Sequence, residues 1–272
     1  MQAQELRVLA EGLLPVVLAA ARVQMAHLAA GVAAIKKADG SPVTIADRES
    51  EAIILAGLER ISPDIPVVSE EAAAAGQTPS IGRRFFLVDP LDGTKPYLRR
   101  EPYFTINVAL IEDRVPVFGL VYAPALEDFY VTTGPDEATE ARLAPSSAPR
   151  SLADCRLKTV HARTPDRDRL AALISSEHMD RATQRFVESY GITEKKAVSS
   201  SLKFGLLARG DADVYPRAGP TSEWDTAAGH AVLAAAGGCV ETLDGAPLLY
   251  GKPGFRNPGF VAWGGRPLRL RA

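Results

Sequence analysis

The amino-acid sequence predicts an α/β fold with an α+β N-terminal part, and three observations lead to that class. The first thirty residues repeat apolar side chains at helical spacing, residues 65–132 contain short β-rich runs, and strands alternate with helices in the second half. The chain has 272 residues, of which 46% are hydrophobic. A chain of this size can bury a core without support from disulfides or structural metals.

The N-terminal part opens with two predicted helices. In the first, apolar residues recur at steps of three and four positions, at Leu6, Leu9, Leu13, Val16, Ala20 and Val23. We expect this helix to end near Gly31 and to be kinked at Pro15. The second helix opens at Thr44 and runs to about Ile61, where prolines at positions 63 and 66 stop it.

Predicted strands follow the second helix, over residues 66–69, 85–88, 103–111, 115–122 and 128–132. The turn Glu112-Asp113-Arg114 is expected to join two of them as a hairpin. Residues 134–154 are rich in Pro, Ala, Ser and Glu, which is typical of a boundary. This pattern predicts an N-terminal subdomain over residues 1–140 and a C-terminal one over residues 150–272.

The second half is predicted to alternate strands with helices. Strands are expected near residues 157–161, 185–188 and 212–215, and helices near residues 166–175, 201–209 and 226–236. This alternation favours an α/β second subdomain.

Composition excludes several classes of function. The chain has 31 basic and 33 acidic residues, so its net charge of -2 does not favour binding of a nucleic acid polymer. Two cysteines, Cys155 and Cys239, are too few for a secreted disulfide framework and indicate a reducing compartment. The apolar stretch 13–21 contains Pro15 and is followed by Arg22, which argues against a membrane span or a signal peptide.

The segment Phe86–Lys95 contains the most informative group of residues. An apolar run leads to Asp89-Pro-Leu-Asp-Gly-Thr94, so that two carboxylates and a glycine turn follow a strand. Carboxylate and carbonyl oxygens suit Mg²⁺, and backbone amides after a turn suit phosphate. A surface turn without function explains this segment alone equally well. An EF-hand is disfavoured, because Pro90 breaks its pattern and Arg100 stands where a bidentate acid is needed.

Other acids share this double interpretation. Glu70 and Glu71 follow a short strand, and Asp225 begins a predicted helix. Taken alone, Asp225 is better explained as a helix cap than as a ligand. Asp47 stands three residues after Thr44, as in a capping box, and capping does not prevent it from taking part in catalysis.

With these residues in view, the sequence resembles the lithium-sensitive, magnesium-dependent phosphatases typified by inositol monophosphatase. The two signatures are Asp89–Thr94 and the run Trp224–Gly238. Within the family it is most similar to the CysQ-type 3'(2'),5'-bisphosphate nucleotidases, from about residue 35 to residue 260. That likeness rests on Lys37–Asp47, Ser69–Glu71, Asp92–Lys95, Ser200–Phe204, Tyr215–Arg217, Gly219-Pro220 and Asn257–Phe260. The resemblance implies a layered αβαβα sandwich.

The resemblance also implies roles for individual residues. Two or three Mg²⁺ ions would be held by Glu70, Asp89, the carbonyl of Leu91, Asp92 and Asp225. Gly93 and Thr94 would contact the scissile phosphate, and Asp47, Glu70 and Thr94 would orient or activate the attacking water. Ser200, Lys203 and Arg217 would face the nucleotide and its second phosphate, next to Glu70, Leu91, Asp92 and Asp225 on the metal side. Without the resemblance, Lys203 and Arg217 are better explained as solvated surface cations.

The sequence departs from the family at one position and gives its histidines no chemical role. Relatives often read Ser-Arg-Ser-His where this chain has Ala162-Arg163-Thr164-Pro165, which puts part of the nucleotide contact in doubt. No role in the chemistry is assigned to His27, His178 or His230. His230 is expected to be packed within its helix.

The leading hypothesis is a magnesium-dependent phosphomonoesterase that removes the 3'-phosphate from adenosine 3',5'-bisphosphate or its sulfated relative. The alternatives are a phosphatase of small polyol phosphates, such as inositol 1-phosphate, and a silent nucleotide sensor. The expected partner is a small phosphorylated nucleotide, and the expected assembly is a monomer or homodimer. The expected location is cytoplasmic, with peripheral contact at the inner membrane as the alternative. The resemblance further implies inhibition by Li⁺.

Overall fold

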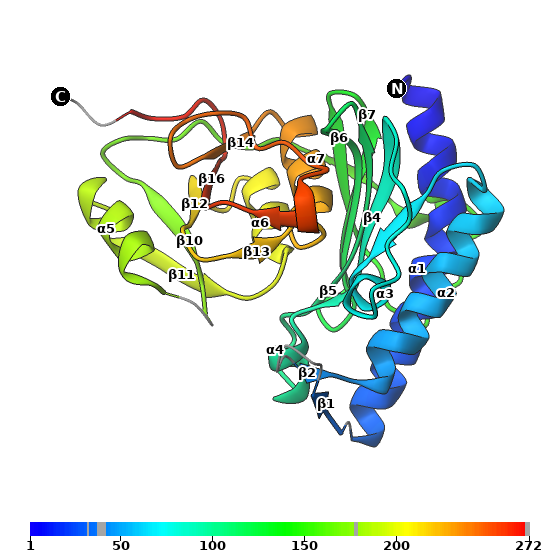
Figure 1. Ribbon diagram of the computed structural model, residues 1–272. Coiled ribbons are helices and arrows are strands. Elements are labelled where there is room, and N and C mark those ends of the chain that lie inside the picture. The colour runs from blue at the N-terminus through cyan, green and yellow to red at the C-terminus, as the bar shows by residue number, and fades with distance from the viewer. Residues whose placement is uncertain (32, 37–41, 177–178, 270–272) are drawn as a thin grey trace.

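The computed structural model describes residues 1–31, 33–36, 42–176 and 179–269, and its elements stack in layers (Figure 1). Two helices, α1 (Ala3–Ala30) and α2 (Ile45–Ile61), cover one face of a large sheet. Two more, α6 (Leu202–Ala208) and α7 (Ala227–Ala235), lie between that sheet and a smaller one. The outer face of the smaller sheet carries α5 (Arg181–Ser189). The layered αβαβα sandwich expected from the sequence is therefore confirmed.

The large sheet has seven strands in the order β3-β4-β5-β6-β7-β8-β9. They are β3 (Val67–Ser69), β4 (Arg84–Asp92), β5 (Thr105–Glu112), β6 (Val115–Ala123), β7 (Asp128–Gly134), β8 (Glu137–Arg142) and β9 (Lys158–Val160). Only the β3–β4 pair is parallel. Glu112 faces Val115 across the β5–β6 turn, which confirms the predicted hairpin.

Alternation along β4 explains why this sheet can be covered on both faces. Phe86 and Val88 join the core beneath α1 and α2, whereas Phe85 and Leu87 join the core shared with α6 and α7. Successive side chains of a strand point to opposite faces, so a strand buried on both faces is apolar throughout. Gly119 on β6 allows α7 to approach closely, because a Cβ there would lie 2.1 Å from the carbonyl oxygen of Ala228.

The small sheet has five strands in the order β11-β10-β12-β16-β14. They are β10 (Ala171–Ser175), β11 (Glu194–Val198), β12 (Val214–Arg217), β14 (Cys239–Thr242) and β16 (Phe260–Trp263). The remaining described elements are short: β1 (Ile35–Lys36), β2 (Pro42–Val43), α3 (Glu70–Ala74), α4 (Thr94–Leu98), η1 (Leu152–Cys155), β13 (Thr221–Ser222), η2 (Pro253–Phe255) and β15 (Arg256–Asn257). None of the helices in the described part of the chain has the length and apolarity that a bilayer crossing needs.

Most predicted elements of the N-terminal part are confirmed. The first helix ends at Ala30 and continues through Pro15, where the expected kink stays a prediction. The second helix begins after Thr44, whose hydroxyl accepts a hydrogen bond from the amide of Ala46 at 3.1 Å. Residues 37–41 of the predicted Lys37–Asp47 motif, and His178, lie outside the described residues.

Two predictions for the later part of the chain were wrong. The helix expected at residues 166–175 is replaced by strand β10, and the strand expected at residues 185–188 is part of helix α5. The strand expected near residues 157–161 is confirmed as β9, although it pairs with β8 and so belongs to the large sheet. The large sheet therefore extends beyond the predicted boundary at residues 140–150. The division into two subdomains stays a prediction.

Candidate active site

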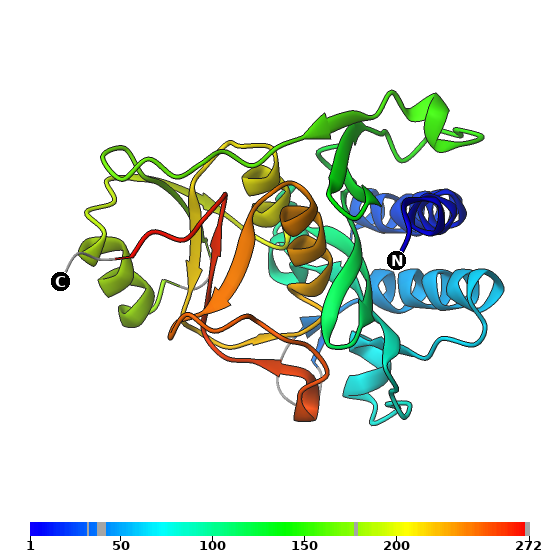
Figure 2. The same ribbon diagram turned by 90° about the horizontal axis from the view of Figure 1, so that it is seen from above.

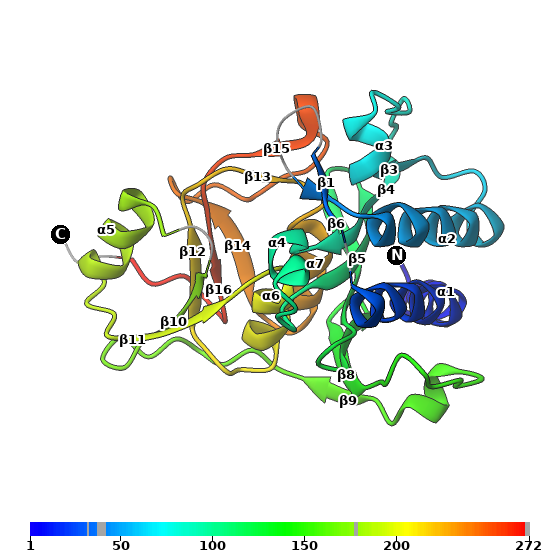
Figure 3. The ribbon, with the colours of Figure 1, turned by 90° about the horizontal axis from the view of Figure 1, so that it is seen from below.

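A pocket of about 210 Å³ brings together residues that lie far apart in the sequence. The lining comes from β2, α3, the end of β4 with α4, the start of α6 and the segment entering it, strands β10, β12 and β13, and the segment entering α7. In Figure 3, which views the molecule from below, α4 lies in front of the region where α6 and α7 meet the large sheet. The lining residues are Pro42, Glu70, Asp92, Gly93, Thr94, Lys95, Pro96, Ser175, Ser199, Ser200, Lys203, Phe204, Tyr215, Arg217, Thr221, Asp225 and Thr226.

The end of β4 delivers two carboxylates to this pocket region. Asp89 faces Asn107 on β5 and Asp92 faces Thr105, and the register between the two strands shifts between these pairs. A bulge of this kind accommodates a proline and redirects the side chains that follow it. Gly93 then turns the chain with φ of +97°, and a Cβ there would lie 2.9 Å from the carbonyl oxygen of Tyr103. The turn into α4 therefore requires glycine.

The carboxylates of this region raise each other's pKa. Burial raises the pKa of the Asp89 carboxyl well above its usual range, and neighbouring carboxylates, Glu70 above all, add to the rise. Burial likewise raises the pKa of Asp225 well above its usual range, with further contributions from Asp92 and Glu70. The pKa of Asp92 is also raised by burial, although the Lys203 ammonium opposes that rise. Their anionic forms therefore repel one another in a place that water reaches poorly.

Backbone amides hold three of these carboxylates in place. The amide of Ser201 donates to Oδ2 of Asp92 at 2.6 Å, and the amide of Ser222 donates to Oδ2 of Asp225 at 2.8 Å. The amide of Leu91 donates to Oδ1 of Asp89 at 3.0 Å. Each carboxylate retains oxygen lone pairs beyond these bonds, because an ionised carboxylate can accept about four hydrogen bonds.

The same residues suit a hard divalent cation by their chemistry. Every predicted donor is an oxygen atom, supplied by Glu70, Asp89, Asp92 and Asp225 together with the carbonyl of Leu91, and Mg²⁺ prefers such donors. Within the described ranges, no three His, Cys, Asp or Glu side chains stand in the arrangement of a preformed metal site. The fit therefore rests on the oxygen donors and on their mutual repulsion, which a bound cation would relieve.

Asp47 and Thr94 approach each other from separate elements. Oδ2 of Asp47 accepts from the amide and the hydroxyl of Thr44, at 2.8 and 2.6 Å, so the side chain caps α2. Its Oδ1 accepts from the hydroxyl of Thr94 at 3.3 Å. That hydroxyl also lies 3.5 Å from the carbonyl oxygen of Leu91. Asp47 is 2% exposed, so the cap and the contact with Thr94 are both shielded from solvent.

The pocket lining also contains cations. Lys203 is 3% exposed, and its ammonium donates to the carbonyl oxygens of Ser200 at 2.7 Å and Val198 at 3.1 Å. It also lies 4.8 Å from the centre of the Tyr215 ring. Burial lowers the pKa of Lys203 to about 7. The ammonium is thus poised to gain from a nearby anion.

Arg217 on β12 adds a second cation to the lining. Its side chain is largely buried and donates to the carbonyl oxygens of Gly219 at 3.4 Å and Pro220 at 3.3 Å. Within the part of the chain that the structure describes, neither Arg217 nor Lys203 forms an ion pair with a carboxylate. The pocket lining therefore combines carboxylates with two cations that form no direct ion pair within the described residues.

Comparison with known proteins places this arrangement in a family. The model of the inositol monophosphatase family matches residues 3–262. The chain belongs to that family. It is 42% identical over 228 residues to the 3'(2'),5'-bisphosphate nucleotidase CysQ of Shigella flexneri, which covers 83% of this chain and 87% of the relative. The CysQ nucleotidase of Escherichia coli K12 is 40% identical over 227 residues, with the same coverage of both chains.

Solved structures of the family share the fold. CysQ from Bacteroides thetaiotaomicron is 30% identical, with a TM-score of 0.76 over 94% of this chain and 97% of that one. The IMPase of Thermotoga maritima is 21% identical, with a TM-score of 0.71 over 92% of this chain and 90% of that one. The second likeness concerns the fold alone.

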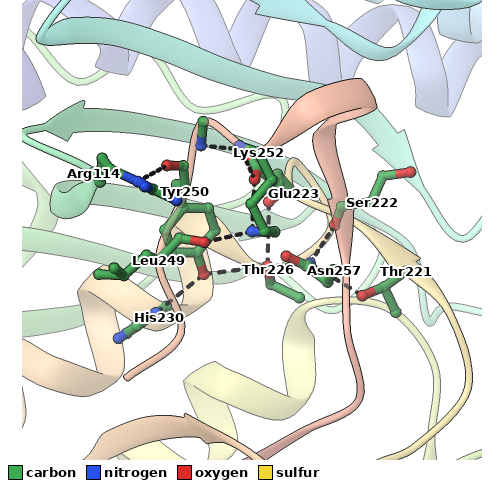
Figure 4. A network of polar contacts seen from close by, with 11 residues as sticks. Arg114, Thr221, Ser222, Glu223, Thr226, His230, Leu249, Tyr250, Lys252 and Asn257 are labelled. Atoms are coloured by element: carbon green, nitrogen blue, oxygen red, sulfur yellow. Dashed lines mark hydrogen bonds and ion pairs between the residues drawn. The ribbon is translucent and has the colours of Figure 1, made fainter. Parts of the chain in front are cut away.

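In this member of the inositol monophosphatase family, a polar network that the sequence did not suggest holds the residues on either side of Asp225. Figure 4 shows this network around Ser222, Glu223 and Thr226. The fully buried Glu223 accepts from the amides of Gly251 at 2.7 Å and Lys252 at 2.9 Å, and pairs with the Lys252 ammonium at 2.6 Å. Asn257 donates to the carbonyl oxygen of Ser222 at 2.8 Å and to the hydroxyl of Thr226 at 3.0 Å. Residues on both sides of Asp225 are thereby fixed to the segment 250–257.

Two further polar residues near Asp92 were missed. Asn107 donates to the hydroxyl of Ser201 at 3.0 Å and approaches Oδ2 of Asp92 at 3.4 Å. The hydroxyl of Ser201 donates to the carbonyl oxygen of Asp225. Ser201 lies inside the quoted segment Ser200–Phe204, so that segment carried a signal for it. Asn107 lies in an apolar strand run with no local motif, and only its pairing opposite Asp89 brings it to the site.

The histidines and the departure from the family pattern lie apart from the pocket lining. Nδ1 of His230 lies 3.0 Å from the Tyr250 hydroxyl, and burial lowers the pKa of this imidazole to about 4, which agrees with a packed, neutral side chain. Arg163 forms a paired contact with Asp213, at 2.8 and 2.7 Å. None of residues 161–165 lines the described pocket. His27 lies 2.9 Å from Glu49 on the surface side of the two N-terminal helices.

Proposed function

We propose that this protein is a 3'(2'),5'-bisphosphate nucleotidase that removes the 3'-phosphate from adenosine 3',5'-bisphosphate, and also acts on its sulfated relative. The observation that carries this proposal is the polarity of the pocket. Three acidic residues suited to a cation, Glu70, Asp92 and Asp225, line it together with the buried cations Lys203 and Arg217, which form no ion pair within the described residues. A substrate with one phosphate to cleave and a second to anchor fits this combination of charges.

The relatives support the same substrate class. The CysQ proteins of Shigella flexneri and Escherichia coli K12 bear the name 3'(2'),5'-bisphosphate nucleotidase, and each covers 83% of this chain. We infer that this chain is accordingly a phosphoric monoester hydrolase. It would act on a small nucleotide in the cytoplasm, as a monomer or homodimer.

The proposed metal site consists of Glu70, Asp89, the carbonyl of Leu91, Asp92 and Asp225, holding two or three Mg²⁺ ions. Bound Mg²⁺ would supply Lewis acidity, which makes water a better nucleophile and neutralises charge that develops on the phosphate. The protein contributes fixed oxygen donors, because backbone amides already orient Asp89, Asp92 and Asp225. Such preorganisation lowers the barrier of a reaction that is extremely slow in water.

The remaining residues orient water and substrate. Thr94 and Asp47 share a hydrogen bond, so Asp47 can take the hydroxyl proton while Thr94 Oγ1 accepts from the attacking water. Glu70, at the start of α3, lines the same side of the pocket and can accept from that water too. The backbone of the Gly93 turn would contact the scissile phosphate. Ser200, Lys203 and Arg217 would hold the nucleotide and its second phosphate.

A comparison of three substrates tests this proposal. Purified protein with Mg²⁺ is expected to release phosphate fastest, by kcat/KM, from adenosine 3',5'-bisphosphate. It should act more slowly on inositol 1-phosphate and fructose 1,6-bisphosphate, which lack an adenosine moiety. Faster release from inositol 1-phosphate would replace the nucleotidase with a phosphatase of polyol phosphates.

One substitution tests whether Asp92 takes part in catalysis. Asp92→Asn keeps the size of the side chain but removes one charge from the proposed metal site. We expect release of phosphate to fall by about a hundredfold or more, as removal of a group that stabilises the transition state typically does. Asp168→Asn, at an exposed carboxylate away from the pocket, is the matched control. Unchanged turnover in Asp92→Asn would remove this residue from the catalytic machinery.

A further inference from the structure

A second cavity, which we call the basic cavity, lies at the edge of the large sheet. It encloses about 780 Å³ and shares no lining residue with the candidate active site. Its walls come from β8, from the segment that connects β8 to β9, from the start of β9 and from the residue after α6. The lining residues are Glu140, Ala141, Arg142, Leu143, Ser147, Ala148, Pro149, Arg150, Asp154, Cys155, Arg156, Lys158 and Arg209.

The connecting segment that forms one wall is anchored along its length. It leaves β8, runs out beside α1 and returns to β9 (Figures 2 and 3). From α1, Arg22 donates to the carbonyl oxygens of Pro145 at 2.9 Å and Ser147 at 3.0 Å. Glu11 of the same helix accepts from the amide of Leu152 at 2.8 Å. Contacts with α1 at residues 145, 147 and 152 therefore hold this wall in place.

Five cations and two carboxylates line the basic cavity, and several of them neutralise one another. Arg142 pairs with Asp128 at 2.6 Å, and Arg150 pairs with Asp154 at 3.4 Å. Arg209 pairs with Asp211, Glu140 and Asp128, at 2.5, 3.6 and 4.0 Å. Two of the five cations have no part in these ion pairs.

Arg156 and Lys158 are the two cavity cations that these ion pairs leave out. Both are exposed at the cavity, and neither forms an ion pair with any other residue in the described part of the chain. Arg156 adopts φ of +52°, a left-handed conformation that costs a non-glycine residue of the order of 1 kcal/mol. Arg156 follows directly after η1, and its left-handed conformation turns the chain there. Residues 156 and 158 both line the cavity.

Apolar groups line the cavity beside these cations. Ala141, Leu143 and Cys155 are buried, and Ala148 and Pro149 complete this part of the lining. Small-molecule sites combine apolar lining with charged groups that fix the orientation of the ligand, and this cavity contains both. The occupant that matches both parts carries a compact anionic group and an apolar body.

We propose that the basic cavity is a binding site for a small organic anion, whose phosphate or sulfonate group is held by Arg156 and Lys158 and whose apolar body rests on Leu143 and Pro149. The site is independent of the proposed nucleotidase activity, because the two cavities have no residue in common. Failure of one proposal therefore does not contradict the other.

The probe for this site is fluorophenylphosphonate, which carries a dianion on an apolar ring and has no ester bond to cleave. Fluorine NMR of the probe, titrated with the full-length protein in EDTA, measures binding while the acidic pocket holds no added metal. Fluorobenzenesulfonate replaces the dianion with a monoanion, and fluorobenzyl alcohol removes the charge. We expect affinity to fall in that order, with no binding of the alcohol.

Variants with equal changes in net charge assign the binding to the cavity. Arg156→Gln with Lys158→Gln is expected to weaken phosphonate binding by more than about tenfold, since two charge-assisted contacts are lost. Arg169→Gln with Lys195→Gln removes one arginine and one lysine from exposed positions elsewhere and should leave binding unchanged. Circular dichroism of both double variants shows whether they keep the native fold.

Four results would overturn the proposal. The first is absence of phosphonate binding by the unmodified protein, and the second is equal weakening of binding in the two double variants. The third is weakening by Lys203→Gln but not by the cavity double variant, which would assign the probe to the candidate active site. The fourth is equal affinity for phosphonate and alcohol, which would show that the cations contribute nothing.

Discussion

Lys203 shows how burial can turn an ordinary lysine into a residue that responds to pH near neutrality. Its pKa is lowered to about 7, with burial as the main cause. The ammonium is therefore present below pH 7 and lost above it. If Lys203 holds the second phosphate of the substrate, KM for adenosine 3',5'-bisphosphate should rise about tenfold as pH increases from 6 to 9, because one charge-assisted contact is lost.

Kinetics of Lys203→Met measure this effect. The variant should have a raised KM at pH 6 and should lack the further rise toward pH 9. Lys195→Met, at an exposed lysine on β11, should keep the profile of the unmodified protein. An identical pH dependence of KM in Lys203→Met would assign that dependence to the metal side or to the substrate.

His230 makes a separate prediction about stability in acid. Its pKa is lowered from 6.5 to about 4 in the folded state, mainly by burial. Between these values the unfolded chain binds a proton that the folded chain does not, so the free energy of unfolding falls as pH decreases from 6.5 to 4. The loss from this residue is at most about 3 kcal/mol.

Denaturant melts of His230→Gln isolate that contribution from the carboxylates, which titrate in the same range. Glutamine retains a polar partner for the Tyr250 hydroxyl but does not bind the proton. The difference in unfolding free energy between the variant and the unmodified protein should shift in favour of the variant as pH falls to 4. A difference that is constant with pH would show that His230 does not contribute to the fall in unfolding free energy between pH 6.5 and pH 4.

At the scale of elements, the turn between β4 and α4 depends on one glycine. Gly93 has φ of +97° and a backbone carbonyl 2.9 Å from where a Cβ would stand. We expect Gly93→Ala to lower the unfolding free energy by about 2 kcal/mol or more and to abolish most phosphatase activity. The strained turn would displace Asp92 and Thr94 on either side of it.

Gly76 offers a matched control for this substitution. It has φ of +75°, yet no atom lies within 4 Å of where its Cβ would stand. Gly76→Ala therefore carries backbone strain without a collision, and it lies in the turn after α3. Thermal melts and phosphate release should show a smaller loss of stability and no loss of activity. Equal behaviour of the two variants would argue against the close approach at Gly93.

The elements that the sequence predicted well are those with a long periodic pattern or a strong end signal. The helix α2 begins at Thr44 and its capping Asp47, as the spacing indicated. By contrast, the apolar run 170–174 is so short that its pattern fits a strand and a buried helix equally well. The segment forms a strand because it pairs with β11 and β12. The missed helix α5 had a usable signal, because Asp180 caps it by accepting from two amides.

The candidate site divides in the same way. Asp89, Asp92, Gly93 and Thr94 are neighbours in sequence, so a local motif sufficed to propose them. Asn107 contributes through strand pairing, whereas Glu223 acts through contacts with the segment 250–252. Their positions follow from tertiary structure, which a single sequence does not display. Their roles as supports for Asp92 and Asp225 become visible only when the sheets and helices are in place.

For the molecule as a whole, near-neutrality hides a local concentration of charge. The net charge is -2, but three carboxylates and two buried cations line a single pocket. Burial raises the pKa of Asp89 and Asp225 well above their usual range. A carboxylate whose folded pKa is raised costs stability as pH increases through that pKa, because the folded state must then hold an unfavourable charge.

Mg²⁺ should therefore stabilise the whole fold, and Asp89→Asn should mimic part of that effect. At 100 times its dissociation constant, one bound ion adds about 2.7 kcal/mol, which raises the melting temperature of a chain this size by several degrees. In EDTA at pH 8, Asp89→Asn should melt above the unmodified protein, because one repelling buried charge is gone. It should then gain less from Mg²⁺.

Thermal melts in EDTA and in Mg²⁺, at pH 6 and pH 8, measure both effects. Asp168→Asn removes a charge from an exposed position and should follow the unmodified protein under all four conditions. A melting temperature that ignores Mg²⁺ in the unmodified protein would contradict the proposed metal site. If Asp89→Asn melts lower than the unmodified protein in EDTA, Asp89 stabilises the fold through its hydrogen bond with Leu91 more than its charge destabilises it. In that case the Asp89 carboxylate would be a net stabilising group in the metal-free protein. Relief of its repulsion could then not be the reason why the site attracts a cation.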